Sequence, residues 1–558
     1  MMAVPSTSGM PAQQRRWIGD LTALQTDEML LDKALGRLAR PLFIIDIDGK
    51  QAFTHGGTMS WNADGEDSSA QGAPLDGFVP PLLPSDLGDA SFKKDLGLKY
   101  AYIVGAMANG ITSVEMVSAA GKNGMLGFFG SGGLSIDQIE TAVQRLQAMQ
   151  TRRFPFGFNL IHSPNDMRLE METVELYLRH GINLVSASAY LGLTLPLVYY
   201  RVKGIHLTSD ERIVCPNHVI AKVSRREVAA RFFAPPPRNL VAQLVQQGKI
   251  SEQEAHLSQF IPMAQDITAE ADSGGHTDNR PALTLLPTVF AIKDEAAERY
   301  GFSMPLRVGL GGGIATPEAV CAAFSMGAAY VLTGSINQAA VEADTSLAVR
   351  QMLVEAQQAD VIMAPAADMF EMGAKVQVLK RGTMFAMRGA KLYELYRTYD
   401  SYSQIPEAAR AAIERDMLRS SFEEAWERTR EYFETRDPQQ IERAQKDRKH
   451  KMALVFRSYL GQASLWAKTG LEDRKIDYQI WCGPAMGAFN AWVKGSFLEN
   501  VDQRHIQVMA MNLMYGAARS MRCHWLRCQG VAIPSGAVHF RPMAIEEIQN
   551  QMEARSMS

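Results

Sequence analysis

Two polar side chains that could do chemistry stand within or just after apolar segments. Lys222 lies in the run HVIAKV (218–223), and a buried ammonium is costly unless it meets an anion. His276 follows Gly274 and Gly275, which leave room for its imidazole over a pocket, and imidazole titrates where general acid–base catalysis needs it. We predict that His276 is catalytic and that Lys222 contacts a ligand. The alternatives are a structural histidine and a lysine that reaches solvent.

Glycine turns on two successive segments indicate a phosphate site. An apolar run from Leu306 meets Gly311, Gly312 and Gly313, a helix signal opens at Thr316-Pro317, and a second apolar run ends at Gly334-Ser335. In (β/α)8 barrels, the turns after strands 7 and 8 aim backbone N–H groups at one phosphate. The segment therefore predicts a phosphorylated ligand.

Small residues and an amide follow three earlier apolar runs. The first run ends in Ala106, Met107 and Asn109, the second in GSGG (130–133), and the third in Asn159. Small residues let a flat ligand approach the backbone, and an amide suits a ring carbonyl or nitrogen. Tight turns and a helix cap are the alternative interpretations of these residues.

Eight apolar runs alternate with segments of helical spacing, such as Ile136 to Gln150 and Met171 to His180. This alternation predicts a parallel sheet buried on both faces, and eight units fit a (β/α)8 (TIM) barrel over 96–360. An open doubly wound sheet is the alternative. An insertion is expected at about 224–265, near Pro235 to Pro237. The predicted strands are 101–107, 124–130, 156–160, 184–190, 218–223, 266–272, 306–312 and 329–334.

The two ends of the chain differ from this repeating pattern. Residues 1–95 indicate an N-terminal extension and small subdomain, with a strand at Leu42 to Asp48 and a Gly/Pro-rich linker over 56–90. Residues 361–558 predict a mainly helical C-terminal lid or docking domain. Its charged stretch, 390–455, is typical of a solvated helix face.

Composition restricts the function classes. The 558 residues are 46% apolar and 21% charged with a net charge of −3, which gives no bulk electrostatic case for nucleic acid or an anionic membrane. Five cysteines and the absence of an 18-residue apolar run or a signal-peptide core favour a cytoplasmic enzyme, with a homodimer as the default. Cys523 and Cys528 lack a second ligand pair, so no metal site is expected.

Several motifs together carry a family resemblance. The glycine segment, DSGGHT (272–277), GAMANG (105–110) and Lys222 resemble the nitronate monooxygenase superfamily, which includes FMN-dependent enoyl-acyl-carrier-protein reductases. Over nearly the whole chain the sequence is more closely similar to the PfaD group, the trans-acting enoyl reductases of polyunsaturated fatty acid and polyketide synthases. The motifs that carry this closer resemblance are FGFNLIHSPND (156–166), SASAYLGLT (186–194), EADSGGHTDNRP (270–281), VLTGSINQ (331–338), APAADMFEMGAKVQVLKRGTMF (364–385) and CGPAMGAFNAWVKGS (482–496).

The resemblance implies an FMN-binding barrel. It implies that hydride from NADPH or NADH reduces the α,β double bond of an enoyl thioester held on an acyl carrier protein. His276 corresponds to the superfamily's active-site histidine and Lys222 to the residue facing the ring's N1/C2-carbonyl side. The superfamily's usual motif Glu-Ser-Gly-Gly-His appears here as Asp272-Ser-Gly-Gly-His. The identity of the acidic residue that partners His276 therefore stays open. Arg280 is expected to meet an anionic group. The implied FMN contacts are Ala106, Met107, Asn109, Asn159, Lys222, Gly274, Gly275, Gly311, Gly312, Gly313, Gly334 and Ser335.

Two further questions stay open from the sequence. Residues near the barrel mouth could form a carrier-protein docking surface, or the C-terminal domain could be a structural buttress. The activity could also be that of a nitronate monooxygenase-like flavin oxidase, or the chain could be a non-catalytic flavin-binding scaffold. The predicted docking residues are Met369, Phe370, Met372, Lys375, Lys380 and Arg381.

Overall fold

The computed structural model describes residues 15–61, 72–149, 154–162, 167–534 and 539–553. The sequence prediction for the first 14 residues and the end of the FGFNLIHSPND motif (163–166) lie outside the described residues.

Eight parallel strands close into a barrel, which confirms the predicted TIM barrel and excludes the open sheet. Each of the eight predicted segments coincides with one of these strands, although β8 runs one residue further, to Ile161. The strand order around the barrel is β12-β13-β15-β16-β6-β7-β8-β9. Their bounds are β6 (Tyr102–Val104), β7 (Leu126–Phe129), β8 (Phe156–Ile161), β9 (Leu184–Ser188), β12 (His218–Val223), β13 (Asp266–Glu270), β15 (Arg307–Gly311) and β16 (Val331–Thr333).

Local capping signals set the starts of the outer helices. Thr316 caps α11 (Pro317–Ser325) as predicted, accepting a hydrogen bond from the Ala319 N–H at 3.2 Å. Ser135 and Gln138 form a capping box on α4 (Ile136–Ala148). The other helices around the barrel are α3 (Val114–Lys122), α5 (Met167–Arg179), α6 (Leu195–Val202) and α10 (Ala282–Tyr300). Helices α2 (Ala90–Leu96) and α12 (Leu347–Val354) precede and follow the barrel strands in the chain.

The expected insertion between β12 and β13 is helical. It holds α7 (Arg226–Phe233), α8 (Arg238–Gln246) and α9 (Glu252–Leu257), and the proline run separates α7 from α8 because proline cannot continue a helix. A short hairpin of β10 (His206–Leu207) and β11 (Ile213–Val214) precedes β12.

A five-stranded sheet forms at the N-terminal end, in the order β3-β2-β5-β1-β4. The predicted strand at residue 42 is confirmed as β2 (Leu42–Ile47), but the linker prediction for 56–90 is wrong where β4 (Thr58–Trp61) and β5 (Ala73–Val79) pair within the sheet. Residues 62–71 of that range lie outside the described residues. The remaining elements here are β1 (Arg15–Ile18), β3 (Lys50–Thr54) and α1 (Glu28–Gly36).

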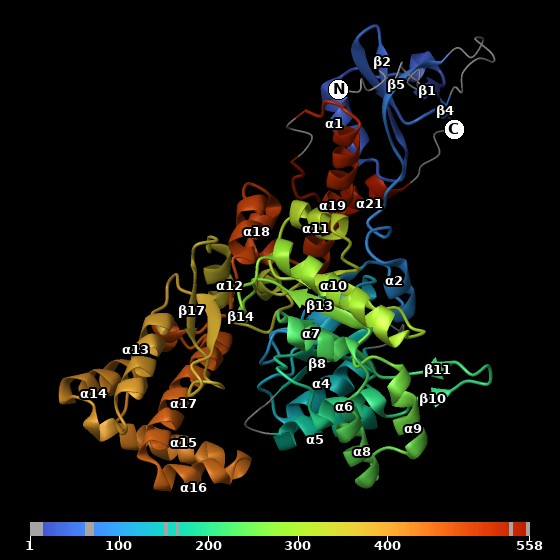
Figure 1. Ribbon diagram of the computed structural model, residues 1–558. Coiled ribbons are helices and arrows are strands. Elements are labelled where there is room, and N and C mark those ends of the chain that lie inside the picture. The colour runs from blue at the N-terminus through green and yellow to red at the C-terminus, as the bar shows by residue number, and fades with distance from the viewer. Residues whose placement is uncertain (1–14, 62–71, 150–153, 163–166, 535–538, 554–558) are drawn as a thin grey trace, which may run out of the picture.

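After the barrel, the chain forms a hairpin and then a helical lobe. Strands β17 (Val361–Pro365) and β18 (Lys375–Leu379) join β14 (Gly275–His276) in a three-stranded sheet that the sequence did not predict. The lobe lies to one side of the barrel (Figure 1), and its helices confirm the predicted helical C-terminal region. They are α13 (Phe385–Thr398), α14 (Glu407–Ile413), α15 (Phe422–Arg436), α16 (Pro438–Lys446) and α17 (Arg448–Thr469).

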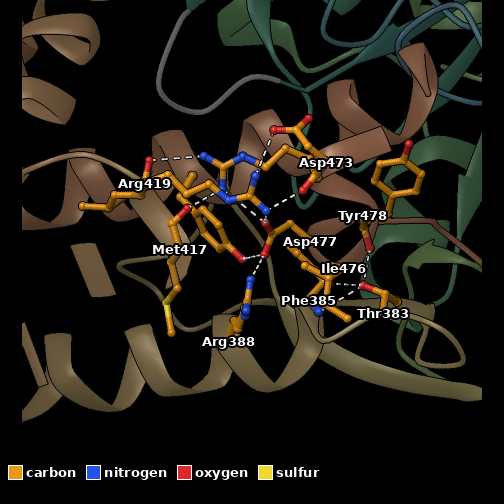
Figure 2. A network of polar contacts seen from close by, with 12 residues as sticks. Thr383, Phe385, Arg388, Met417, Arg419, Asp473, Ile476, Asp477 and Tyr478 are labelled. Carbon is orange, nitrogen blue, oxygen red and sulfur yellow. Dashed lines mark hydrogen bonds and ion pairs between the residues drawn. The ribbon is translucent and has the colours of Figure 1, made fainter. Parts of the chain in front are cut away.

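A buried carboxylate holds the lobe together. Asp477 is fully buried and accepts hydrogen bonds from Arg388, from the Tyr459 hydroxyl at 2.8 Å and from Arg474 at 3.2 Å. Arg474 also donates to the carbonyl of Met417, which joins the turn after α14 to the end of the lobe. Figure 2 shows this network, in which the charges of Asp477 and its arginines offset one another away from water.

The last part of the chain returns to the barrel. Helix α18 (Ala485–Val493) is followed by α19 (Ile506–Cys528), which packs along α11 and reaches the N-terminal sheet (Figure 1). Cys321 on α11 is buried, and burial raises the pKa of its thiol. The final helix is α21 (Ile545–Met552). Among the described helices, none is both long and apolar enough to cross a bilayer.

Candidate active site

A cleft of about 1490 Å³ opens at the C-terminal ends of the barrel strands. Its walls are the βα turns of the barrel, the β17–β18 hairpin and helices α15 and α17 of the lobe. Active sites of TIM barrels lie at this end of the strands. The structure brings the predicted catalytic residues and FMN contacts to this one cleft, namely Ala106, Met107, Asn109, Asn159, Lys222, Gly274, Gly275, His276, Gly311, Gly312, Gly313, Gly334 and Ser335.

Two glycines after β15 and β16 leave bare backbone facing the cleft. A Cβ at Gly313 or at Gly334 would meet no protein atom within 4 Å. Gly312 differs, because a Cβ there would lie 2.6 Å from the backbone carbon of Ala271. Gly312 and Gly313 also have φ of +84° and +73°, which favour glycine. Open backbone of this kind fits a phosphate group.

Lys222 meets a protein anion. Its ammonium lies 2.8 Å from the carboxylate of Glu270, and both side chains are mostly buried. Lys222 on β12 lies opposite Thr268 on β13. Glu270 follows Thr268 by two residues, so the side chains of Thr268 and Glu270 point to the same face of β13. The lysine still lines the cleft, where its charge is available to a second anionic partner.

Asn159 is buried with its amide orientation fixed. Its Nδ2 donates to the carbonyl of Ser186 at 2.9 Å and to the Ser188 hydroxyl at 3.0 Å. Both donor positions are therefore used by the end of β9, and the amide oxygen is the group left to face a ligand.

His276 has an acidic partner from the hairpin. Its Nε2 lies 3.2 Å from the carboxylate of Asp368 and donates to it, while 34% of the histidine side chain remains exposed. Burial alone would lower the pKa of His276, but the hydrogen bond and charge of Asp368, with the charge of Glu270, raise it above its ordinary value. Asp272, the acidic residue of the sequence motif, instead accepts from Gln377 at 2.7 Å.

Helix α17 holds the turn that follows β6. Asn109 has a φ of +58°, and its Nδ2 donates to the Ser464 hydroxyl at 3.2 Å. The Lys468 ammonium donates to the Asn109 carbonyl and pairs with Asp344 at 2.9 Å. The lobe therefore fixes a turn that is otherwise strained for a non-glycine residue.

The segment directly before α18 lies against two of the barrel's glycine turns. The Gly483 N–H donates to the Ser335 hydroxyl at 3.0 Å. A Cβ at Gly274 would lie 3.0 Å from the Cys482 backbone, so Gly274 permits this close approach. Gly275 instead has a φ of +79° and open space beside it.

The sequence comparison identifies the barrel's family. The pattern described as "Nitronate monooxygenase" matches residues 90–387, more than half of the chain. The chain belongs to the nitronate monooxygenase family. A second pattern, "[Acyl-carrier-protein] S-malonyltransferase, inserted helical domain", matches residues 399–478 of the lobe.

Similarity to a solved relative assigns the chain to a narrower group within the nitronate monooxygenase family. The crystal structure of the enoyl reductase domain of MlnA, from the macrolactin biosynthesis cluster of Bacillus amyloliquefaciens, is 40% identical with a TM-score of 0.76, covering 80% of this chain and 99% of that domain. This chain therefore belongs with the PfaD-type enoyl reductases of the nitronate monooxygenase superfamily, which confirms the resemblance.

Two curated relatives are longer than this chain. The polyketide biosynthesis protein PksE of Bacillus subtilis is 45% identical over 78% of this chain and 56% of its own length. A polyunsaturated fatty acid synthase component of Thraustochytrium is 43% identical over 81% of this chain and 30% of its own length. This chain therefore spans about half or less of these two proteins.

The structure removes one residue, Phe370, from the predicted docking surface. Phe370 is fully buried in the core of the lobe and cannot contact a partner. Lys380 and Arg381 do not line the cleft, and Arg381 lies 3.7 Å from Asp360. Arg280 is exposed outside the cleft lining. The other three predicted docking residues, Met369, Met372 and Lys375, do line the cleft.

Proposed function

We propose that this protein is an FMN-dependent enoyl reductase. Its substrate would be an α,β-unsaturated thioester on an acyl carrier protein of a polyketide or polyunsaturated fatty acid synthase, and its hydride donor NADPH or NADH. The observation that carries the proposal is the convergence of an open glycine backbone, Lys222 and His276 on one cleft of a PfaD-type barrel.

The residues present fit FMN. Gly311 to Gly313, Gly334 and Ser335 would hold its phosphate, because bare backbone at two of these positions lets an anion approach. The small turn from Ala106 to Asn109 would contact the isoalloxazine ring, and Gly274 and Gly275 would border it. Asn159 and Lys222 would face its polar edge. Bound FMN supplies the hydride chemistry between the nicotinamide and the β-carbon of the enoyl group.

The chain's own residues would then manage charge and protons. Lys222, oriented by Glu270 at 2.8 Å, provides positive charge where negative charge accumulates. His276 keeps its proton to higher pH than an ordinary histidine, because Asp368 favours the imidazolium. A protonated His276 can donate a hydrogen bond to the thioester oxygen as that oxygen becomes negative, and the α-carbon takes up a proton from solvent water.

A flavin oxidase remains the second candidate, because the family pattern on residues 90–387 is named for nitronate monooxygenase. In that reaction O2 would replace the enoyl thioester as the electron acceptor. The two candidates use the same cofactor site and differ in the acceptor.

Steady-state NADPH oxidation by FMN-loaded protein tests the proposal. We expect turnover to depend on added crotonyl-pantetheine and to fall about 10²- to 10⁴-fold in His276→Ala. His206→Ala, which changes an exposed histidine outside the cleft, is the matched control and should retain activity. Unchanged turnover in His276→Ala with intact FMN binding would remove the histidine from the mechanism.

A further inference from the structure

A second cavity in the helical lobe adjoins the active-site cleft. It has a volume of about 280 Å³, and four residues line both spaces. Arg419, Arg428 and Arg474 are among its lining residues, and no described carboxylate is. The shared residues are Arg428, Ser458, Gln462 and Trp466. Arg419 pairs with Asp473 and Arg474 with Asp477, so Arg428, which lines both spaces, is the arginine of this cavity that forms no ion pair with a described residue.

One face of α15 presents two arginines and a tyrosine to the cleft. Arg428, Tyr432 and Arg436 follow one another at four-residue spacing, which places them on the same side of a helix over about 12 Å. All three line the cleft, and all three are exposed. We refer to these three residues as the α15 stripe.

The side chains of both arginines in the α15 stripe hydrogen-bond to hydroxyl groups, and the charge of Arg428 also acts on the carboxylate of Glu424, one turn earlier. Arg428 donates to the Ser420 hydroxyl at 2.6 Å, and Arg436 donates to the Tyr432 hydroxyl and lies 4.4 Å from the centre of its ring. Among residues 15–61, 72–149, 154–162, 167–534 and 539–553, no carboxylate forms an ion pair with either arginine.

Other cations on the same wall are already neutralised. Arg457 pairs with Glu371 at 3.1 Å and Lys468 with Asp344 at 2.9 Å. The carboxylate on this wall, Asp437, accepts from Gln440 at 2.9 Å. On α15 and α17, Arg428 and Arg436 are therefore the cleft-lining cations that form no ion pair with a described residue, and the carboxylate of Asp437 lies beside Arg436 in the chain.

We infer that the α15 stripe is the docking surface for an acidic, phosphopantetheinylated carrier protein. The inference rests on the proposed function, since a thioester on a phosphopantetheine arm must enter this cleft from outside. When the thioester lies in the cleft, the phosphate of the arm and the acidic side chains of the carrier protein lie at the cleft entrance. Exposed guanidinium groups suit both, because they bind phosphate and carboxylate oxygens with paired hydrogen bonds. The surface lies on α15, within the charged stretch whose simplest interpretation is a solvated face.

Kinetics with two substrates test the inference. The variant is Arg428→Glu/Arg436→Glu, and the substrates are crotonyl-carrier protein and crotonyl-pantetheine, which lacks both phosphate and protein. We expect the KM for the carrier substrate to rise about tenfold or more, with kcat, the KM for NADPH and turnover of crotonyl-pantetheine unchanged. Raising the salt concentration should increase the wild-type carrier KM and affect the variant less.

The matched control is Arg397→Glu/Lys446→Glu, which makes the same charge change at exposed positions of the lobe outside the cleft lining. It should leave the carrier KM close to wild type. An unchanged carrier KM in Arg428→Glu/Arg436→Glu overturns the inference, and so does an equal loss with both substrates.

Direct binding separates this inference from the proposed function. Fluorescence anisotropy of labelled holo-carrier protein reports docking even if the protein reduces no thioester. Binding that is weakened about tenfold in Arg428→Glu/Arg436→Glu and retained in the control supports the docking surface, whatever the reaction. Equal binding by wild type and variant contradicts it.

Discussion

Gly313→Ala should separate FMN binding from stability. Gly313 has a φ of +73° and Gly301, the residue that ends α10, a φ of +57°, and a Cβ at either meets no protein atom within 4 Å. Alanine at either position therefore costs about 1–2 kcal/mol of backbone strain and creates no clash. Only Gly313 lines the cleft, so only its new methyl group would stand where the phosphate approaches.

The expected loss of affinity follows from the contacts displaced. A hydrogen bond to a charged group contributes about 1.5–3 kcal/mol, so displacing one raises the Kd for FMN about 10- to 100-fold. Fluorescence titration of FMN into apoprotein measures the Kd, and thermal unfolding of the apoproteins should show similar Tm decreases for Gly313→Ala and the control Gly301→Ala. An unchanged Kd in Gly313→Ala, or an equal change in both variants, would refute the phosphate assignment.

Three further substitutions address the hairpin and the lobe. Asp368→Asn removes the charge that raises the pKa of His276, so the high-pH limb of kcat, where the acid form is lost, should move to lower pH in a pH–rate profile. Lys468→Met removes a donor to the Asn109 carbonyl and should shift the absorbance spectrum and weaken the binding of FMN, with Lys468→Arg restoring part of both. Asp477→Asn leaves buried arginines without their carboxylate and should lower the free energy of unfolding by about 3–5 kcal/mol in urea denaturation.

Each of these three predictions has an outcome that would contradict it. A pH profile of Asp368→Asn that overlays wild type would mean that the carboxylate does not tune His276. A wild-type flavin spectrum and a wild-type Kd for FMN in Lys468→Met would show that the lobe does not control the turn after β6. A loss below about 1 kcal/mol in Asp477→Asn would show that water or a neighbouring group already solvates the arginines.

The barrel was predictable because its signals are local. Between Leu306 and Ser335, two apolar runs, two glycine turns and the Thr316 cap all act within one supersecondary unit. The same holds for several other strands, which end in the residues predicted to face a ligand. Family resemblance then supplied the cofactor and the reaction class, which the local pattern alone left open.

The partners of the site residues were not predictable from local pattern. Asp368 contacts His276 from 92 residues away, and Ser464 and Lys468 reach Asn109 across 355 and 359 residues. A lone Asp, Ser or Lys in a helical or loop segment carries no sign of such a contact. Only the placement of the hairpin and α17 against the barrel mouth brings these groups together.

Strands β4 and β5 of the N-terminal sheet were missed for a different reason. Strand β5 (Ala73–Val79) contains proline and glycine, which locally indicate a linker. A Cβ at Gly77 would lie 2.5 Å from Val531, so the glycine is there to let the C-terminal segment approach the sheet. The requirement comes from a residue more than 450 positions away and leaves no local signature.

Anaerobic reduction and reoxidation of the bound flavin tests the central claim most directly. NADPH should bleach the oxidised-flavin absorbance of the loaded protein, and crotonyl-carrier protein added without oxygen should restore it with formation of butyryl-carrier protein. Reduced flavin that is reoxidised by air but not by the thioester would contradict the enoyl reductase assignment in favour of a flavin oxidase. A protein that binds no flavin would contradict the cofactor site itself.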